Sequence, residues 1–313
     1  GQKYHIDVNN IRTMQDLDKP FRDMKEGEGK GFYPLQMSQG SPFNGFFNEY
    51  DGLTAGLQPL GVKVDDQTRT VICTLEQPDI MENLKLLHQW YQDGIINPDA
   101  NVLTEPQKKL PFASAQGWSS AVATWQVLNG VEKYDAFKVF GPLYSTDTIQ
   151  GSMNAVSINS KYKDECLKFL QLVNTDSKLR DMLAYGVPDK TFVYVGDGVI
   201  KKQTDTWPLA AYTQGTFFNM SITEDADPDQ WDQVKKQNEE AVSSSCLGFS
   251  LDLTNIQNEM SNCLTVWQKY KYDLLTGASD PETAVPAVIQ ELKAAGFDTV
   301  VQEAQKQINE FYN

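Results

Sequence analysis

The sequence contains no long apolar run, since nowhere do 18 or more apolar residues follow one another. A helix that crosses a bilayer needs about 20 such residues. The first ten residues also lack the charged and then apolar pattern of a secretion signal. We therefore expect the chain to be soluble as written. Gly1 stands where an initiating Met would be, which indicates either a cloning scar or a processed start.

Histidine and paired cysteines are scarce. Only His5 and His88 are available for imidazole chemistry, and His88 lies in a helical pattern. The four cysteines are far apart and form no CxxC pair, so the spacing of a zinc ribbon or a thioredoxin-like motif is missing. Cys166 and Cys263 fall among apolar residues at helical spacing, where a buried thiol is the ordinary interpretation. We expect no bound metal and no cofactor.

Positive charge is also in short supply. The chain has 27 basic and 42 acidic residues, which gives a formal net charge of −15. This charge repels nucleic acid phosphates and anionic membrane surfaces. The composition therefore argues against nucleic acid as a partner.

Catalytic and phosphate-binding signatures are absent. The sequence has no GxSxG, no Walker loop and no GxGxxG, and the glycine-rich residues 27–31 follow a polar helix end, not a strand. The acidic residues 224–229 resemble a calcium loop, but the glycine and the final glutamate of such a loop are missing. A solvated approach to a helix is the simpler interpretation. We expect no catalytic residues.

Helices and strands alternate along the first two thirds of the chain. Thr13 and Asp16 resemble a capping box before a helix, and Ile80, Leu84 and Leu87 follow helical spacing. Further helices are expected at 164–173 and 176–185. Hairpins are expected at 62–74 and 191–200, and strands at 32–35, 120–124, 137–143 and 153–158. Such alternation predicts an α/β layer structure.

Beyond Asp229 the pattern is almost purely helical. One long helix ends at Gly277, and Asp280 followed by Pro281 predicts the N-terminus of the next. Gly296 ends that helix and the last one follows.

These C-terminal residues carry a family resemblance. The segments that carry it are Leu274-Leu275-Thr276-Gly277, Asp280-Pro281-Glu282, residues 292–298, Gln305-Lys306-Gln307 with Phe311, and Gly248-Phe249 with Asp252. Together they resemble the C-terminal module of LipO-like bacterial lipoproteins, a domain of unknown function.

Upstream segments resemble extracellular solute-binding proteins of the maltose-binding kind. The matching segments are residues 4–8 (with His5 in place of the usual glycine), 11–17, 90–99, 119–125 and 153–170. The resemblance implies an α/β, periplasmic-binding-protein-like type II lobe with a helical C-terminal region. It implies a second lobe at 1–151, a segment returning to the first lobe or hinge at 152–205, and a helical C-terminal module at 206–313.

The same resemblance implies a function. It predicts the extracellular solute-binding component of an ABC importer, which binds an oligosaccharide or another small molecule between two lobes and delivers it to the permease subunits in the membrane. The family's first lobe, with its signal peptide and lipid-bearing cysteine, would precede Gly1. The predicted location is the cell surface, as a lipoprotein whose anchor lies outside this chain. Residues 152–205 would then need either a shorter first lobe or another chain to pack against.

Aromatic side chains in loops are the candidate ligand contacts, because their faces stack on sugar rings. The candidates are Phe43, Phe46, Trp118, Trp125, Trp207, Tyr212 and Phe217, with Asn44 and Asn219 for the hydroxyls. By the resemblance, Trp125 occupies the place of a sugar-stacking aromatic, and Phe43 lies near another. Plain packing is the alternative for each aromatic, and turn closure is the alternative for each amide.

Two other classes remain open. A carbohydrate-active hydrolase needs only two suitably spaced carboxylates, which an acidic chain always offers. A non-catalytic interaction module could use the helical tail as a docking face.

Overall fold

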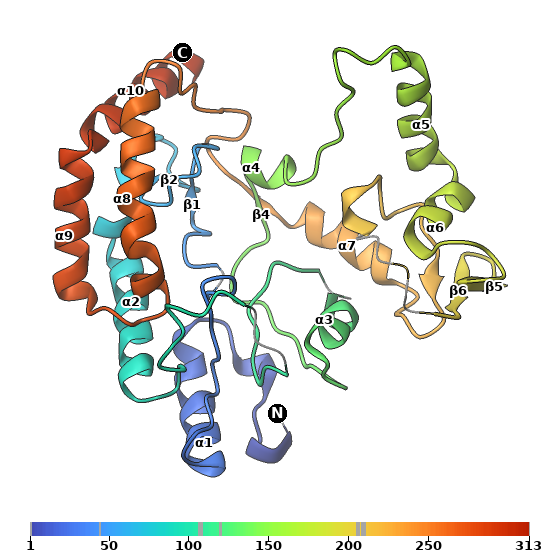
Figure 1. The fold of residues 1–313 in the computed structure, drawn as a ribbon, viewed down its shortest axis with the longest axis horizontal. Helices are drawn as coiled ribbons and strands as arrows, with labels where there is room; N and C mark the ends of the chain where they lie inside the picture. Colours follow the sequence, from blue (N-terminus) through green and yellow to red (C-terminus); the bar gives the residue numbers. More distant parts are fainter. Residues whose placement is uncertain are drawn as a thin grey trace. The chain divides into compact units, whose positions relative to one another are not determined.

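The structure is a computed structural model that describes residues 2–43, 45–105, 109–118, 121–204, 207 and 211–312 (Figure 1). The chain divides into two compact units. Unit 1 contains Gly1–Gly117, Ala121–Thr148 and Ala241–Asn313, and unit 2 contains Trp118–Ser120 and Ile149–Glu240. Residues 206–240, which the resemblance places in the C-terminal module, cluster with unit 2.

Unit 1 begins with three short 3₁₀ helices that lead into α1. They are η1 (Gln2–Tyr4), η2 (Val8–Asn10) and η3 (Gln15–Leu17), and α1 is Asp18–Glu28. The predicted capping box is present, because an Asp16 carboxylate oxygen accepts from Thr13 N at 2.8 Å while Thr13 Oγ1 accepts from Asp16 N at 3.3 Å.

A small antiparallel sheet follows in the order β1-β2-β3. Its strands are β1 (Tyr50–Asp51), β2 (Leu60–Lys63) and β3 (Ile72–Cys73), with η4 (Thr74–Glu76) directly after. Leu60 pairs with Cys73, so the hairpin predicted at 62–74 is confirmed. A separate parallel pair joins β4 (Leu143–Tyr144) to β8 (Val242–Ser243).

Helices from both ends of the sequence form the main core of unit 1. They are α2 (Pro78–Gln92), α8 (Gln257–Leu275), α9 (Pro281–Ala294) and α10 (Phe297–Tyr312), and Figure 1 shows α2, α8 and α9 side by side. Each buries one apolar stripe, as for a surface helix on a core. Trp90 and Trp267 are 0% and 1% exposed at the centre of these stripes. The indole of Trp267 donates to Gln58 Oε1 at 2.9 Å, so its polar atom is satisfied.

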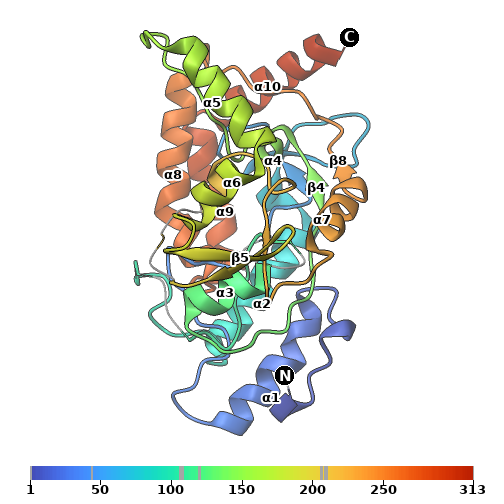
Figure 2. The same cartoon turned by 90° about the vertical axis from the view of Figure 1, so that its right-hand side faces the viewer.

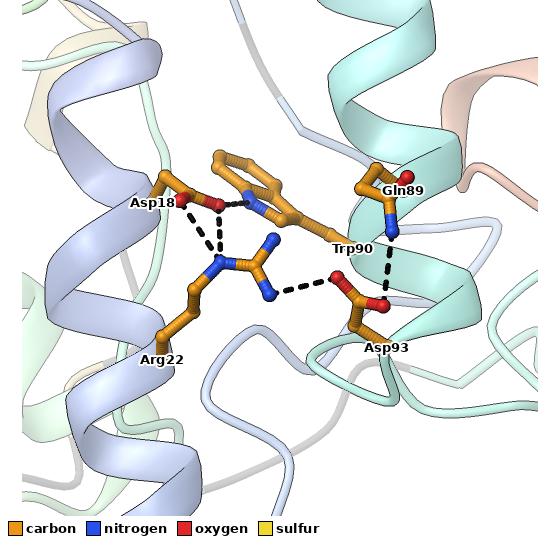
Figure 3. Close-up of polar contacts among 5 residues, drawn as sticks. All are labelled: Asp18, Arg22, Gln89, Trp90 and Asp93. Atoms are coloured by element: carbon orange, nitrogen blue, oxygen red, sulfur yellow. Dashed lines mark hydrogen bonds and ion pairs between the residues drawn. The ribbon is translucent and has the colours of Figure 1, made fainter.

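Helix α1 is joined to α2 by a network of polar contacts (Figure 3). Asp18 accepts from the buried Trp90 indole at 2.8 Å and from Arg22 Nε at 2.9 Å. Arg22 also donates to Asp93 at 2.8 Å, and Gln89 donates to the other Asp93 oxygen at 2.9 Å. The indole N–H is therefore satisfied by a carboxylate whose charge is balanced by Arg22.

Unit 2 contains helices, a hairpin and a third strand. Its elements are α5 (Lys163–Thr175), α6 (Ser177–Tyr185), β5 (Phe192–Gly196), β6 (Val199–Lys202), η5 (Ala211–Thr213), β7 (Ile222–Thr223) and α7 (Gln230–Glu239). The predicted hairpin is confirmed, with Gly196 opposite Val199. Figure 2 shows α5 running into α6 beside this hairpin.

Four stretches predicted as strands form no strand, or only the end of one, among the described residues. Residues 121–124 belong instead to helix α3 (Ala121–Asn129), and Ser120 lies outside the described residues. Of residues 137–143, only Leu143 lies in a strand, β4, which is followed by the short helix α4 (Thr146–Ile149). Residues 153–158 pair with no strand in the described part of the chain. Residues 32–35 make only the single bridge Leu35 to Ile96. A β-forming sequence becomes a strand only where a partner strand lies beside it.

No helix in the described ranges is both long enough and apolar enough to span a bilayer.

The turn between α8 and α9 gives a first testable prediction. Gly277 has φ +77°, and a Cβ there would overlap the Leu87 carbonyl of α2. Gly277→Ala should lower the free energy of unfolding by about 3 kcal/mol, because left-handed strain and a backbone overlap add together. Urea denaturation followed by circular dichroism measures the loss.

Gly56→Ala is the matched control, since Gly56 has φ +73° but nothing lies within 4 Å of its Cβ position. It should cost about 1 kcal/mol, from backbone strain alone. Equal losses in the two variants would show that close approach to α2 does not constrain the turn.

The Asp18 network predicts a dependence of stability on pH. Burial, the largest contribution, raises the pKa of Asp18, but hydrogen bonds from Arg22 and Trp90 and the Arg22 charge outweigh it, so the pKa lies below its ordinary value of 3.8. This stabilisation is complete above about pH 4 and is lost as the pH falls through the lower, folded-state pKa. Arg22→Met should therefore cost about 1 kcal/mol at pH 7, because the network is partly exposed, and less near pH 3.

Urea denaturation at both pH values measures this difference. Lys19→Met is the control, because Lys19 pairs with Asp23 on the exposed side of α1. That variant should change the stability little at either pH. A cost of Arg22→Met that stays the same or grows on acidification would contradict the assignment to Asp18.

Candidate functional site

Phe43 and Phe46 belong to the core of unit 1. Their side chains are 4% and 5% exposed, and Phe43 stacks on Phe112 with ring centroids 6.2 Å apart and an interplanar angle of 12°. Their ring faces are covered by other aromatics, so we do not retain them as ligand contacts. Asn44, predicted beside them, lies outside the described residues.

Trp125 lies on helix α3 in unit 1 and is partly exposed. Its indole ring lies against the backbone of Gly117, where a Cβ would overlap the ring. Its carbonyl accepts from the Asn129 side chain at 3.0 Å, which fixes the last turn of the helix. Trp125 is therefore a surface aromatic with one side supported by backbone.

Two of the predicted aromatics of unit 2 are exposed. Trp207 is 42% exposed and donates its indole N–H to the Leu183 carbonyl at 2.8 Å. Tyr212 is 59% exposed. These rings have accessible faces, as a stacking contact with a sugar requires.

The remaining predicted residues of unit 2 meet around Phe217. The Phe217 ring lies 5.6 Å from Trp118 and 5.2 Å from Trp231, and it is nearly parallel to Trp231 at 18°. The guanidinium of Arg180 lies 6.0 Å from the Phe217 centroid. We call Trp118, Phe217 and Trp231 the aromatic cluster. All three are partly exposed, and the central ring is held between the other two.

Trp231 was not predicted from the sequence. It lies in the first turn of α7, separated by one residue from the acidic residues 224–229, where the sequence indicates the start of a helix. Its indole N–H donates to the Met220 carbonyl at 3.0 Å, and this carbonyl belongs to the turn that carries Phe217. Trp231 supports Phe217 only because the fold brings that turn beside α7. No signal in the neighbouring sequence indicates this contact.

Asn219 lies in the same turn as Phe217. Its Nδ2 donates to the Val173 carbonyl at 3.4 Å, a long hydrogen bond. Its Oδ1 is buried and has no hydrogen-bond partner among the described residues. An unpaired acceptor beside aromatic rings is suited to a hydroxyl donor from a ligand.

The acidic residues 224–229 are engaged in local structure. Asp227 accepts from Asp229 N at 2.9 Å and from Gln233 Nε2 at 2.7 Å, and the first of these bonds contributes most to lowering the pKa of Asp227. Among the described residues, no group of three His, Cys, Asp or Glu side chains could hold a metal ion.

Three of the four thiols, those of Cys73, Cys246 and Cys263, are buried. Burial raises the pKa of Cys73, Cys246 and Cys263 to about 11 in each case. A nucleophilic cysteine needs a lowered pKa. These side chains therefore act as small apolar groups in unit 1.

The sequence is similar to one protein family and to one group of transport proteins. Residues 245–313 match the family described as domain of unknown function DUF3502. Over 99% of its length, the chain is 27% identical to a "carbohydrate ABC transporter substrate-binding protein" of Streptococcus pneumoniae serotype 4. The chain spans 64% of the length of that relative.

Solved structures agree on the fold. The N-glycan transport solute binding protein (NgtS) of S. pneumoniae matches with a TM-score of 0.85 at 24% identity, over 99% of this chain and 70% of that one. The same protein in complex with Man5GlcNAc matches with a TM-score of 0.81 at 23% identity, with equal coverage. The predicted α/β class is thus confirmed, and the predicted C-terminal domain of unknown function is present as the match at residues 245–313. This chain has the fold of ABC-transporter solute-binding proteins.

Proposed function

We propose that this chain is the solute-binding component of an ABC importer and that it binds a carbohydrate. The observation that carries the proposal is the similarity over 99% of the chain to a protein named for carbohydrate transport, together with a shared fold. The exposed aromatics and the unpaired Asn219 oxygen supply the chemistry that a sugar needs.

The proposed ligand contacts are aromatic side chains and one amide, and they are given for each unit by itself. In unit 2 they are Trp118, Phe217 and Asn219, with Trp231 as their support and Trp207 and Tyr212 as further exposed rings. In unit 1 the contact is Trp125. Because Phe217 is flanked by two rings and a guanidinium, we assign it to support and edge contact, and we assign sugar stacking to Trp118 and Trp125.

An oligosaccharide is the proposed ligand class. NgtS was solved with Man1GlcNAc and with Man5GlcNAc, so oligosaccharides of mannose and N-acetylglucosamine are the first to test. Several aromatic rings would accommodate several sugar units, since each ring stacks on one pyranose face.

The remaining parts of the proposal concern partners and location. We propose an extracellular protein, held at the cell surface by a lipid anchor outside this chain, that delivers its ligand to the permease subunits of the importer. It is non-catalytic, so it releases the glycan intact. The alternatives are a hydrolase, which would cleave the glycan, and an interaction module, which would ignore it.

A thermal-shift screen tests the function. We expect the full-length protein to be stabilised by Man5GlcNAc but not by amino acids or peptides. At a hundredfold excess over the dissociation constant, binding to the folded state alone adds about 2.7 kcal/mol, which is easily visible as a rise in Tm. Reducing sugar is measured in the same wells.

A shift without sugar release supports the binding protein, and sugar release would favour the hydrolase. A rise in Tm with peptides alone would show that the ligand is a peptide and not a carbohydrate. A flat response across oligosaccharides, peptides and amino acids would favour the interaction module.

Substitution of the stacking residues tests the site. Trp125→Ala and Trp118→Ala should each weaken glycan binding by about 1 kcal/mol or more, roughly fivefold, because a stacked face is lost from the contact. Their stabilities should change little, since both side chains are partly exposed. Isothermal titration with Man5GlcNAc measures the affinity.

Tyr162→Ala is the matched control, because Tyr162 is a surface aromatic of unit 2, 68% exposed, that we place outside the site. It should bind the glycan with wild-type affinity. Wild-type affinity in Trp125→Ala or Trp118→Ala would remove that residue from the site.

A further inference from the structure

Two consecutive buried charges hold the turn that carries Phe217 and Asn219. Arg180 and Asp181 lie on helix α6 and are 0% and 1% exposed. Charged side chains are almost never so deeply buried unless they have partners. Arg180 and Asp181 form hydrogen bonds to the two ends of residues 216–221, which we call the 216–221 turn.

Arg180 holds the first end of the 216–221 turn. Its Nε donates to the Thr216 carbonyl at 2.9 Å. Thr216 N in turn donates to the Asn174 side chain at 3.0 Å, so both backbone groups of Thr216 are fixed. The Arg180 guanidinium also lies beside the Phe217 ring.

Asp181 holds the other end. One carboxylate oxygen accepts from Ser221 N at 2.8 Å, and the other accepts from Ser221 Oγ at 2.7 Å and from Tyr194 Oη at 3.0 Å. Burial, and then the Asp181 charge, raise the pKa of Tyr194 to about 12, so this phenol remains a donor at neutral pH. Tyr185, also from α6, donates to the Ser221 carbonyl at 2.6 Å.

We propose that Asp181, with Arg180, is a positioning residue for glycan recognition, which fixes the 216–221 turn, and with it Phe217 and Asn219, in one conformation before the ligand binds. The proposal rests on the proposed function. Its physical reason is preorganisation, since a turn fixed before binding loses less conformational entropy when the ligand arrives.

Burying Arg180 and Asp181 costs free energy, which indicates that the pair serves a purpose other than stability. Two buried charges lose much of their hydration, and a well-packed apolar pair on α6 would often be at least as stable. What this pair provides, and apolar residues cannot, is directional hydrogen bonding to both ends of one short turn. Trp231 completes the support through its bond to Met220, inside the same turn.

Asp181→Asn tests the proposal in the full-length protein. The amide keeps the shape but cannot accept from both Ser221 and Tyr194 with the strength of a carboxylate. We expect at least tenfold weaker binding of Man5GlcNAc by titration calorimetry, at a temperature where every variant is folded. We also expect at least tenfold faster hydrogen exchange of the Ser221 amide in the absence of glycan.

Asp176→Ala is the matched control on the same helix. Asp176 caps α6 by accepting from Leu179 N at 3.0 Å, so the variant also removes one carboxylate and loosens α6 without touching the 216–221 turn. It should bind the glycan within twofold of wild type and leave Ser221 exchange unchanged. Ser221→Ala, which keeps the backbone contact to Asp181, should weaken binding about threefold.

The outcomes separate the two proposals. Binding or Ser221 exchange in Asp181→Asn that matches the Asp176→Ala control would overturn the positioning role and leave the function standing. Failure of the wild-type protein to bind the glycan would overturn the function, and Ser221 exchange would still decide whether Asp181 fixes the turn.

Discussion

Unit 1 depends on the docking of its last helix onto backbone that comes from distant parts of the sequence. Gln305 accepts from Val71 N at 2.8 Å and donates to the Arg69 carbonyl at 3.1 Å. Gln307 makes the same two-way contact with Asp252, at 2.9 and 3.0 Å. Each primary amide thus pairs with a backbone N–H and a backbone C=O, which would otherwise lack partners beside the apolar stripe of α10. The helix can bury its apolar face there because its glutamines satisfy the backbone that it covers.

The same constraint explains the motif by which the C-terminal domain resembles its family. The two glutamines of Gln305-Lys306-Gln307 bind backbone, whereas Lys306 between them reaches only Glu303 on its own helix. The earlier glycine motif serves the opposite end of the helical layer, where Gly277 lets the chain turn against α2 and its carbonyl lies 2.8 Å from His88 Nδ1. Gln305 and Gly277 of this domain therefore contact the first hundred residues, whereas Gln307 ties the last helix to Asp252 of the domain itself.

The sequence predicted the elements whose signals are local. The capping box at Thr13, the helix from Pro78 and the hairpin turn at Gly198 each depend on neighbours a few residues away, so pattern was sufficient. The strands at 120–124 and 153–158 failed because β-structure needs a partner from elsewhere in the chain. The site shows the same limit. Phe43 in a glycine-rich loop looks exposed from its sequence, yet the fold covers it, while Trp231 in an acidic segment looks like a helix start, yet it supports Phe217.

The two units differ in how they bury charged side chains, and this difference bears on function. Among the described residues of unit 1, Asp51 is the one charged side chain that is buried, at 2% exposed, and the Asp18 network keeps its carboxylate partly exposed while the indole alone is buried. Unit 2 instead buries an arginine and an aspartate in one helix turn and directs both at a single short loop. Stability alone does not favour such an arrangement, because desolvation offsets much of the electrostatic gain. A requirement for one fixed loop conformation does favour it, because any other conformation of the loop would lose hydrogen bonds at one end or the other. The 216–221 turn carries an unpaired amide oxygen and the central ring of the aromatic cluster. A binding protein needs such a turn to hold one conformation.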